Sequence, residues 1–447
     1  MIPRDHASTM QIDQTTFADL SVFHTADEFS LFNKLDQTRT VGGRIQLFQL
    51  FSQPFSDLEK IRETQLILAI ILRNENAWGP SISNGTVMVM ERFYETALDI
   101  IPAGYDPLTA GSYKLFHAPD YSLTRYSIGH FADFIRGMKS IVSLLDKEAC
   151  PPMLDGLLQR VRRLLDQETL NSLAETKPGK KFSPPEVVRY GYFIRNRFKT
   201  AALDLIGIYG KLDAWYSMAL STKQFRMVMP EFSNQEGPYI ELTALYHLLL
   251  SEPVSYDLKM DPGCNFVFLT GANMAGKSTF IRAVGCALFL AHLGMGVPAD
   301  KMKLGLFDGI LSNINVADNL IKGESYFYNE VHRIKNTIIL INDQKKWLVL
   351  IDELFKGTNV EDAMKCSSVV IKGLIRIKTS LFVLSTHLYE IGEELKIYPN
   401  ISFKYFETEV KDDQLVFSYQ LRNGISNDRL GYLILKREGV VDLLDKS

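Results

Sequence analysis

The chain has 447 residues, 46% of them apolar and 23% charged, which is the composition of an ordinary folded protein with room for two or three domains. The formal net charge of −3 gives no global basic field, so any contact with nucleic acid must be local. The four cysteines lie far apart without C-x-x-C spacing, which argues against a zinc site or a disulfide framework and favours a reducing, cytoplasmic setting.

The apolar segments do not predict a membrane protein. The N-terminus, Met1–His6, lacks the charged-then-apolar layout of a signal peptide. The longest apolar segment, Ala283–Val297, contains His292 and three glycines, so we expect a buried helix there and no membrane contact.

Residues 1–236 are predicted to be helical. Thr40–Arg44 is predicted as a turn, and a loop rich in Pro, Gly and Tyr is predicted between the helices Val87–Ile101 and Ser127–Leu145. The other predicted helices are Ile45–Phe51, Asp57–Leu72, Met153–Leu170 and Glu186–Leu220. The last two flank Lys177–Pro185, whose prolines exclude a helix, and helices joined by a short loop run antiparallel, like a lever arm.

The loop between these two helices is a candidate nucleic-acid contact. Lys177, Lys180 and Lys181 lie in it, and arginines lie on both flanking helices. Lysines grouped in this way fit contacts with backbone phosphates. A solvated loop with exposed charges is the alternative interpretation, and charge runs more often mean that.

From residue 237 onward, predicted strands and helices alternate, which is typical of a parallel sheet covered by helices. Buried strands are predicted at Trp347–Ile351 and Leu381–Ser385, and an antiparallel hairpin at Ile401–Val410 and Gln414–Leu421. The predicted helices are Val331–Ile341, Glu361–Ile377, Leu388–Leu395 and Asp428–Arg437.

A glycine-rich motif organises this second half. The apolar run Asn265–Thr270 leads into Gly271–Ser278, which fits G-x-x-x-x-G-K-[ST], and a helix-like segment follows. Glycines let successive N–H groups point at phosphate oxygens, and the helix N-terminus adds its dipole. Lys277 then reaches the β- and γ-phosphates and the Ser278 hydroxyl ligates Mg²⁺, so the motif predicts a nucleoside triphosphate site.

Polar residues follow two of the predicted strands. Asp352 and Glu353 end an apolar strand, where Asp352 would hold Mg²⁺ and Glu353 would act as general base on the attacking water. His387 follows the next strand and is expected near the γ-phosphate. The segment Gly323–Glu330 opens a helix, and from the residues alone Ser325 reads as its N-cap.

These motifs, in this order and spacing, resemble the MutS family of DNA mismatch-repair ATPases. Thr270–Thr279 meets the family pattern T-G-x-N-M-x-G-K-S-T, with Ala275 where the family usually has Gly, and Gly424–Tyr432 resembles its C-terminal glycine-containing loop. Ser30–Pro54 and Glu186–Leu220 resemble parts of its core and lever. The resemblance implies an all-helical core and lever domain over 1–236 and an ABC-type P-loop NTPase domain over 237–447.

The resemblance also implies roles for residues. It assigns ATP binding to the loop residues, Mg²⁺ to Ser278 and Asp352, catalysis to Glu353 and sensing to His387. Because the family acts as head-to-tail dimers, Ser325 would reach the partner subunit's γ-phosphate, which replaces the cap reading. Tyr256 is the candidate for the adenine-stacking aromatic. The loop residues are Gly271, Asn273, Met274, Ala275, Gly276, Lys277, Ser278 and Thr279.

Several family features have no counterpart here: the mismatch-reading domain, the connector and most of the clamp. We therefore expect an ATPase that couples a dimer cycle to movement of lever arms around DNA, in mismatch repair or related sensing of DNA structure. The alternative is an ATPase that acts on a protein or a structured RNA, and a nucleotide-gated scaffold with little turnover is a third possibility, against which the Asp352–Glu353 pair argues.

Overall fold

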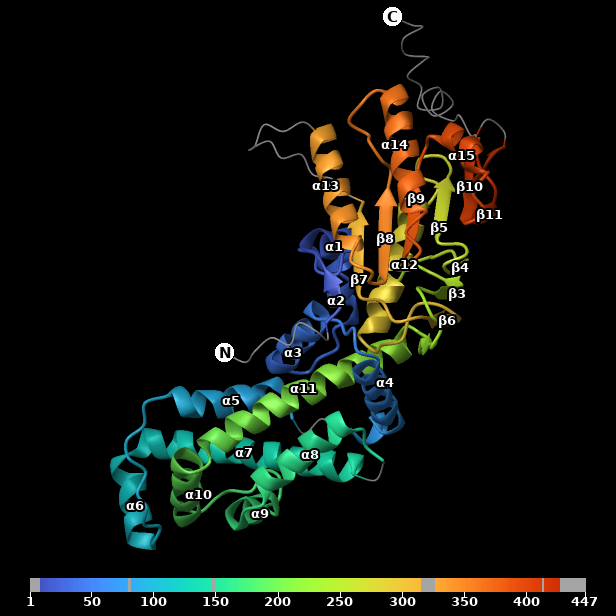
Figure 1. Cartoon of the computed structure of the whole chain (residues 1–447). Coiled ribbons are helices and arrows are strands. Elements are labelled where there is room, and N and C mark those ends of the chain that lie inside the picture. The colour runs from blue at the N-terminus through green and yellow to red at the C-terminus, as the bar shows by residue number, and fades with distance from the viewer. Residues whose placement is uncertain (1–8, 79–81, 147–148, 315–325, 412–413, 427–447) are drawn as a thin grey trace, which may run out of the picture. The chain divides into compact units, whose positions relative to one another are not determined.

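The computed structural model describes residues 9–78, 82–146, 149–314, 326–411 and 414–426 (Figure 1). The chain divides into two compact units. One comprises Met1–Lys34, Gln53–Arg62 and Gln224–Ser447, and the other comprises Leu35–Ser52 and Glu63–Lys223. The architecture is mixed, with a helical part ahead of most of the sheet, as predicted. The units do not follow a single cut at residue 236, because the first 34 residues group with the sheet.

The helical unit is built around two long helices, α7 and α11. Phe93 meets Phe131 edge-on at a ring distance of 5.8 Å, and Phe134 meets Tyr209 at 6.1 Å, so aromatic side chains fill its core. Its elements are α3 (Val41–Ser52), α4 (Leu58–Arg73, divided by the unit boundary), the 3₁₀ turn Glu75–Ala77, α5 (Asn84–Glu95), α6 (Pro107–Phe116), α7 (Ala118–Leu145), α8 (Pro152–Leu165), α9 (Glu168–Ala174), α10 (Pro184–Asn196) and α11 (Lys199–Gln224).

Several predicted helix bounds in this unit were wrong. The predicted loop before Ser127 contains α6 and the first turns of α7, because Asp106 caps α6 by accepting from the N–H groups of Leu108 and Thr109. The long helix predicted over Glu186–Leu220 is interrupted after α10, where the chain bends and Phe198 enters the core. Met153–Leu170 is likewise divided between α8 and α9.

A buried carboxylate joins α11 to the start of α3. Asp213 accepts from the backbone N–H groups of Arg39 and Thr40 at 3.0 and 2.9 Å, and from the Thr40 hydroxyl at 2.7 Å. A Cβ on Gly43 would lie 2.1 Å from the Asp213 carboxylate, so only glycine permits this approach. The predicted turn Thr40–Arg44 is therefore a helix start, with glycine serving close packing.

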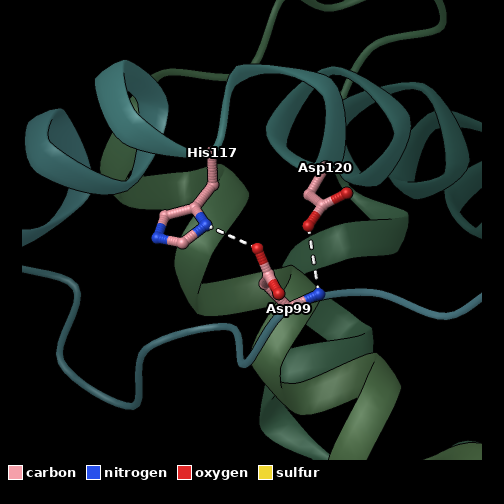
Figure 2. Close-up of side chains that lie close together, drawn as sticks. All are labelled: Asp99, His117 and Asp120. Atoms are coloured by element: carbon pink, nitrogen blue, oxygen red, sulfur yellow. Dashed lines mark hydrogen bonds and ion pairs between the residues drawn. The ribbon is translucent and has the colours of Figure 1, made fainter.

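A second polar cluster ties the chain after α5 to the start of α7 (Figure 2). His117 Nδ1 lies 2.8 Å from Asp99 Oδ2, and the N–H of Asp99 donates to Asp120 Oδ2 at 3.0 Å. Asp120 lies in the first turn of α7, where free backbone N–H groups favour negative charge. The cluster fixes how the chain enters its longest helix.

The other unit contains two sheets. The larger has the order β1-β7-β8-β9-β5-β10-β11, and the smaller has the order β2-β6-β3-β4. The strands are β1 (Gln11–Ile12), β2 (Glu231–Phe232), β3 (Ile240–Leu245), β4 (Tyr256–Met260), β5 (Phe266–Thr270), β6 (Lys301–Leu304), β7 (Gly309–Asn313), β8 (Trp347–Asp352), β9 (Ser380–Ser385), β10 (Ile401–Lys411) and β11 (Gln414–Asn423). The helical elements are α1 (Gln14–Asp19), the turn Asp27–Phe29, α2 (Leu31–Leu35), α12 (Lys277–His292), α13 (Tyr326–Ile341), α14 (Val360–Leu374) and α15 (Tyr389–Leu395).

Helices cover both faces of the larger sheet (Figure 1). Trp347, Val349 and Ile351 of β8 pack in one cluster with residues of α13, α14 and α15. Leu350, which points to the opposite face, lies against Gly285 of α12. Strands buried on both faces read as continuous apolar runs, which is why β5, β8 and β9 were predicted.

The N-terminal residues form one edge of this sheet. β1 pairs in parallel with β7, and Asp19 of α1 accepts from the Ser312 hydroxyl and the Ile314 N–H. The expectation that residues 1–236 are entirely helical is wrong at β1 and at β2, which pairs with β6, because two-residue strands carry no periodicity and are set by distant partners.

At the other edge, β10 runs parallel to β5 and antiparallel to β11, which confirms the predicted hairpin. The predicted helix Asp428–Arg437 lies outside the described residues. In the described part of the chain, none of the helices has the length and apolar character needed to cross a membrane.

Candidate functional site

The glycine loop connects β5 to α12, as the motif predicts. Gly271 and Gly276 have φ of +141° and +108°, and Gly276 is the N-cap of α12. A Cβ on Gly271 would lie 3.2 Å from the backbone of Phe406 in β10, so this position combines unusual backbone geometry with close packing. The loop thus packs closely against β10 and ends at the N-terminus of α12, where backbone N–H groups are free to bind a ligand.

Lys277 is the first residue of α12 and is buried. Its ammonium donates to the carbonyls of Gly271 and Ala272 at 2.8 and 3.0 Å. Burial lowers the pKa of Lys277, and the nearby carboxylates of Glu353 and Asp352 partly offset that effect. The lysine therefore places a cation inside the loop, bonded to groups that a stronger acceptor can replace.

Three side chains meet where β8 and β9 end. The Ser278 hydroxyl donates to Asp352 Oδ2 at 2.5 Å, and the Ser385 hydroxyl donates to Asp352 Oδ1. Asp352 and Ser385 are directly paired in the sheet register. Parallel strands end at one edge of a sheet, so strand order brings a carboxylate and two hydroxyls to the start of α12.

Glu353 continues from Asp352 in a left-handed conformation, with φ of +65°. Its Oε2 lies 3.7 Å from His387 Nδ1 and 3.4 Å from the ammonium of Lys356. His387 first, and then Lys356 and Lys277, lower the pKa of Glu353 to about 2 although burial opposes this. The carboxylate is therefore ionised at neutral pH and held beside the ammonium of Lys356 and the imidazole of His387.

A pocket of about 460 Å³ opens above the glycine loop. Glu353 reaches it from the strand side. The other lining residues are Leu250, Glu252, Val254, Tyr256, Ala272, Asn273, Met274, Gly276, Lys277, Ser278, Thr279 and Tyr419. The pocket thus brings together most of the residues predicted to bind nucleotide. Gly271, Ala275, Asp352 and His387 are not among its lining residues; buried Ala275 has its side chain packed in the interior.

Two tyrosines border this pocket in different ways. Tyr256 is 5% exposed and packs edge-on against Phe280 and Phe406. Tyr419, on β11, is 42% exposed. Sequence reasoning gave Tyr419 no role, because only the strand order brings β11 next to the loop. The predicted hairpin, placed beside β5, was the signal that could have found it.

The remaining predicted residues lie elsewhere or cannot be placed. Ser325 lies outside the described residues. Lys177, Lys180 and Lys181 lie in the exposed loop between α9 and α10, and Lys180 donates to Glu186 at 2.7 Å. Two arginines of α8, the helix before α9, are also engaged, since Arg160 pairs with Asp204 and Arg162 pairs with Asp146.

Comparison with known proteins gives concordant results for this half of the chain. Residues 267–442 match the family model of MutS domain V. A stretch of 250 residues is 29% identical to the DNA mismatch repair protein MutS of Thermotoga maritima, covering 55% of this chain and 31% of that protein. The MutS proteins of Thermotoga petrophila and Staphylococcus haemolyticus are 32% and 28% identical over 236 and 244 residues, which are 52% and 53% of this chain and 29% and 27% of theirs.

The glycine loop, the strands that end beside it and the helices that cover the sheet are therefore those of a MutS domain V. Residues 267–442 belong to the MutS domain V family, and about half of the chain is similar to MutS proteins. The matched stretch spans less than a third of the length of the curated MutS proteins with which it was compared.

Proposed function

We propose that this chain binds ATP with Mg²⁺ at the glycine loop and hydrolyses it, as an ABC-type P-loop NTPase. The observation that carries the proposal is the convergence of Lys277, Ser278 and Glu353 on one pocket of nucleotide size. Lys277 would exchange its two loop carbonyls for phosphate oxygens, which are stronger acceptors for a buried cation.

The oxygen donors beside the pocket fit a magnesium ion. Ser278 and Asp352 offer a hydroxyl and a carboxylate that already approach within 2.5 Å, and Mg²⁺ prefers oxygen ligands of this kind. Ser385 holds the other Asp352 oxygen and so fixes the carboxylate plane. Bound Mg²⁺ supplies neutralisation of phosphate charge.

Glu353 is proposed as the general base that orients and deprotonates the attacking water. Its carboxylate reaches the pocket and is ionised, and the imidazole of His387 lies within 3.7 Å of it. His387 is placed to respond when charge develops beside Glu353, which fits a sensing role. Tyr419 is proposed to stack on the nucleotide base, because its ring is exposed at the pocket, whereas Tyr256 is enclosed by two phenylalanines.

Two substitutions test the ATPase. Lys277→Ala removes a charge-assisted donor, which should weaken ATP binding about 10- to 100-fold. Glu353→Gln should keep ATP binding and lower the hydrolysis rate at least about 100-fold, as expected for a lost general base. Lys365→Ala, at an exposed lysine on α14, is the matched control. Undiminished hydrolysis in Glu353→Gln would remove Glu353 from this role.

We further propose that the chain works as a head-to-tail dimer in the cytoplasm, in which Ser325 acts on the partner subunit's nucleotide. The cycle would move the helical unit as a lever around DNA, in mismatch repair or related sensing of DNA structure. The relatives are DNA mismatch repair proteins, which supports DNA as the partner. ATP moves such arms only if the open and closed states bind it differently.

Salt dependence tests the DNA contact. The affinity for DNA falls as salt rises, so the plot of log affinity against log salt has a negative slope. If Lys177, Lys180 and Lys181 contact phosphates, replacing all three by alanine should make this slope less steep by up to about 3. The absence of any binding to duplex DNA would favour the alternative, an ATPase acting on a protein or a structured RNA. The acidic net charge and the pairing of Lys180 with Glu186 are the observations that favour this alternative.

A further inference from the structure

Helix α13 carries a buried carboxylate that has no place in the site described so far. Glu330 is 4% exposed. Its Oε1 accepts from the N–H of Lys356 at 3.0 Å, and its Oε2 accepts from the N–H of Gly357 at 3.1 Å. One side chain therefore holds two successive backbone groups of the loop that follows β8.

The backbone of that loop adopts an unfavourable conformation at two residues. Glu353 and Phe355 adopt φ of +65° and +59°, a left-handed conformation that residues other than glycine rarely take. Such a conformation persists where neighbouring groups over-determine it. On one side the N–H of Glu353 donates to the Ser385 carbonyl at 3.0 Å, and on the other side Glu330 holds the chain.

A second contact joins the same two elements. Phe327, one turn before Glu330 on α13, packs against Phe355 at a ring distance of 5.8 Å. Lys356 then turns its ammonium back to within 3.4 Å of Glu353. By fixing the backbone of Lys356, Glu330 also fixes the cation beside Glu353. Glu330 itself is not among the residues that line the nucleotide pocket.

We propose that Glu330 is a positioning residue for hydrolysis: it holds the 353–357 loop in the backbone conformation that directs Glu353 into the pocket. This inference rests on the proposed ATPase. Glu330 links α13 to the loop that carries the proposed general base, and α13 begins one residue after Ser325. A shift of α13 along its axis would pull on Lys356 and Gly357 and so displace Glu353.

Glu330→Gln and Glu330→Ala in the full chain test the proposal. Glutamine keeps the shape but accepts only one of the two N–H groups, and alanine accepts neither. We expect kcat to fall at least about tenfold in Glu330→Ala and by less in Glu330→Gln, with KM and the Kd of a fluorescent ATP analogue within about threefold of wild type. The control is Glu361→Gln, at an 83% exposed carboxylate on α14, which should behave as wild type.

Hydrogen exchange gives a readout that does not depend on activity. In Glu330→Gln one of the two amides, that of Lys356 or that of Gly357, should exchange at least about tenfold faster than in wild type, because it loses its acceptor. Unchanged exchange, or a kcat within threefold of wild type in both variants, overturns the proposal. If Glu330→Ala does not fold, Glu330→Gln decides. A wild-type chain that does not hydrolyse ATP refutes the ATPase alone, and faster exchange would then still support the positioning of the loop.

Discussion

Protonation of His292 should destabilise the sheet unit in acid. This residue ends α12 with no exposed surface. Its Nδ1 lies 2.6 Å from the Phe55 carbonyl, which needs a donor, and its Nε2 accepts from the Phe307 N–H at 3.4 Å. A protonated ring would place a second N–H against that amide. Burial lowers the pKa of His292 to about 4 from 6.5, although the bond to Phe55 opposes this.

The magnitude follows from proton linkage. Between pH 6.5 and about 4 the unfolded chain binds a proton that the folded chain does not, so stability is complete above this range and falls as the pH decreases. At 1.36 kcal/mol per pH unit, the free energy of unfolding should lose about 2 kcal/mol at pH 5 and about 3 kcal/mol near pH 4.

His292→Gln isolates this contribution, because glutamine supplies an uncharged donor and acceptor. Urea denaturation of both proteins at pH 7 and pH 5 gives two stability differences, in which all other titrations cancel. The wild type's advantage should shrink by about 2 kcal/mol at pH 5. His24→Gln, at an exposed ring in the same unit, is the matched control substitution. A difference that is equal at both pH values would refute the assigned protonation state.

Three further substitutions test the packing and the pocket. In Gly309→Ala the new Cβ would lie 2.1 Å from the rigid ring of Trp347, so urea denaturation should show a loss of about 1–3 kcal/mol. Asp213→Ala leaves three buried donors without their acceptor, and the free energy of unfolding of the helical unit should fall by at least about 3 kcal/mol. Tyr419→Ala should raise the Kd of ATP about tenfold with little change in kcat, the value of one lost base–aromatic stack; an unchanged Kd would contradict its proposed role.

The parts of the fold that the sequence predicted are those set by local pattern. The runs at β5, β8 and β9 are continuous because both faces of the sheet are covered, and the glycine motif lies between a strand and a helix as its chemistry requires. The grouping of Ser278 with Asp352 also follows from local rules, since both lie at the ends of elements that parallel topology brings together. Their roles remain predictions.

Other features depend on partners far along the chain. Pro107 and Pro119 were read as loop residues, whereas both open helices, because a missing N–H costs nothing in a first turn. The glycines after Thr40 were read as a turn because the approach of Asp213 is invisible in the sequence. Tyr419 carries no motif and was found only because the sheet order places β11 beside the pocket. Glu330 lies in the segment Gly323–Glu330, but its role was found only from its hydrogen bonds to the loop after β8.

The pairing of β1 with β7 also affects the order in which the two units can fold during synthesis. The helical unit is complete once the ribosome has made α11, so it can fold while the strands of the larger sheet after β1 are still unmade. β1 and α1 must wait for β7 and the residue after it, because β1 pairs with β7 and Asp19 of α1 accepts from Ser312 and Ile314. A fragment starting after Lys34 would leave the backbone of β7 unpaired along one side, an edge prone to association with other chains. β1 is thus held in place by β7, a strand that is translated about 300 residues after it.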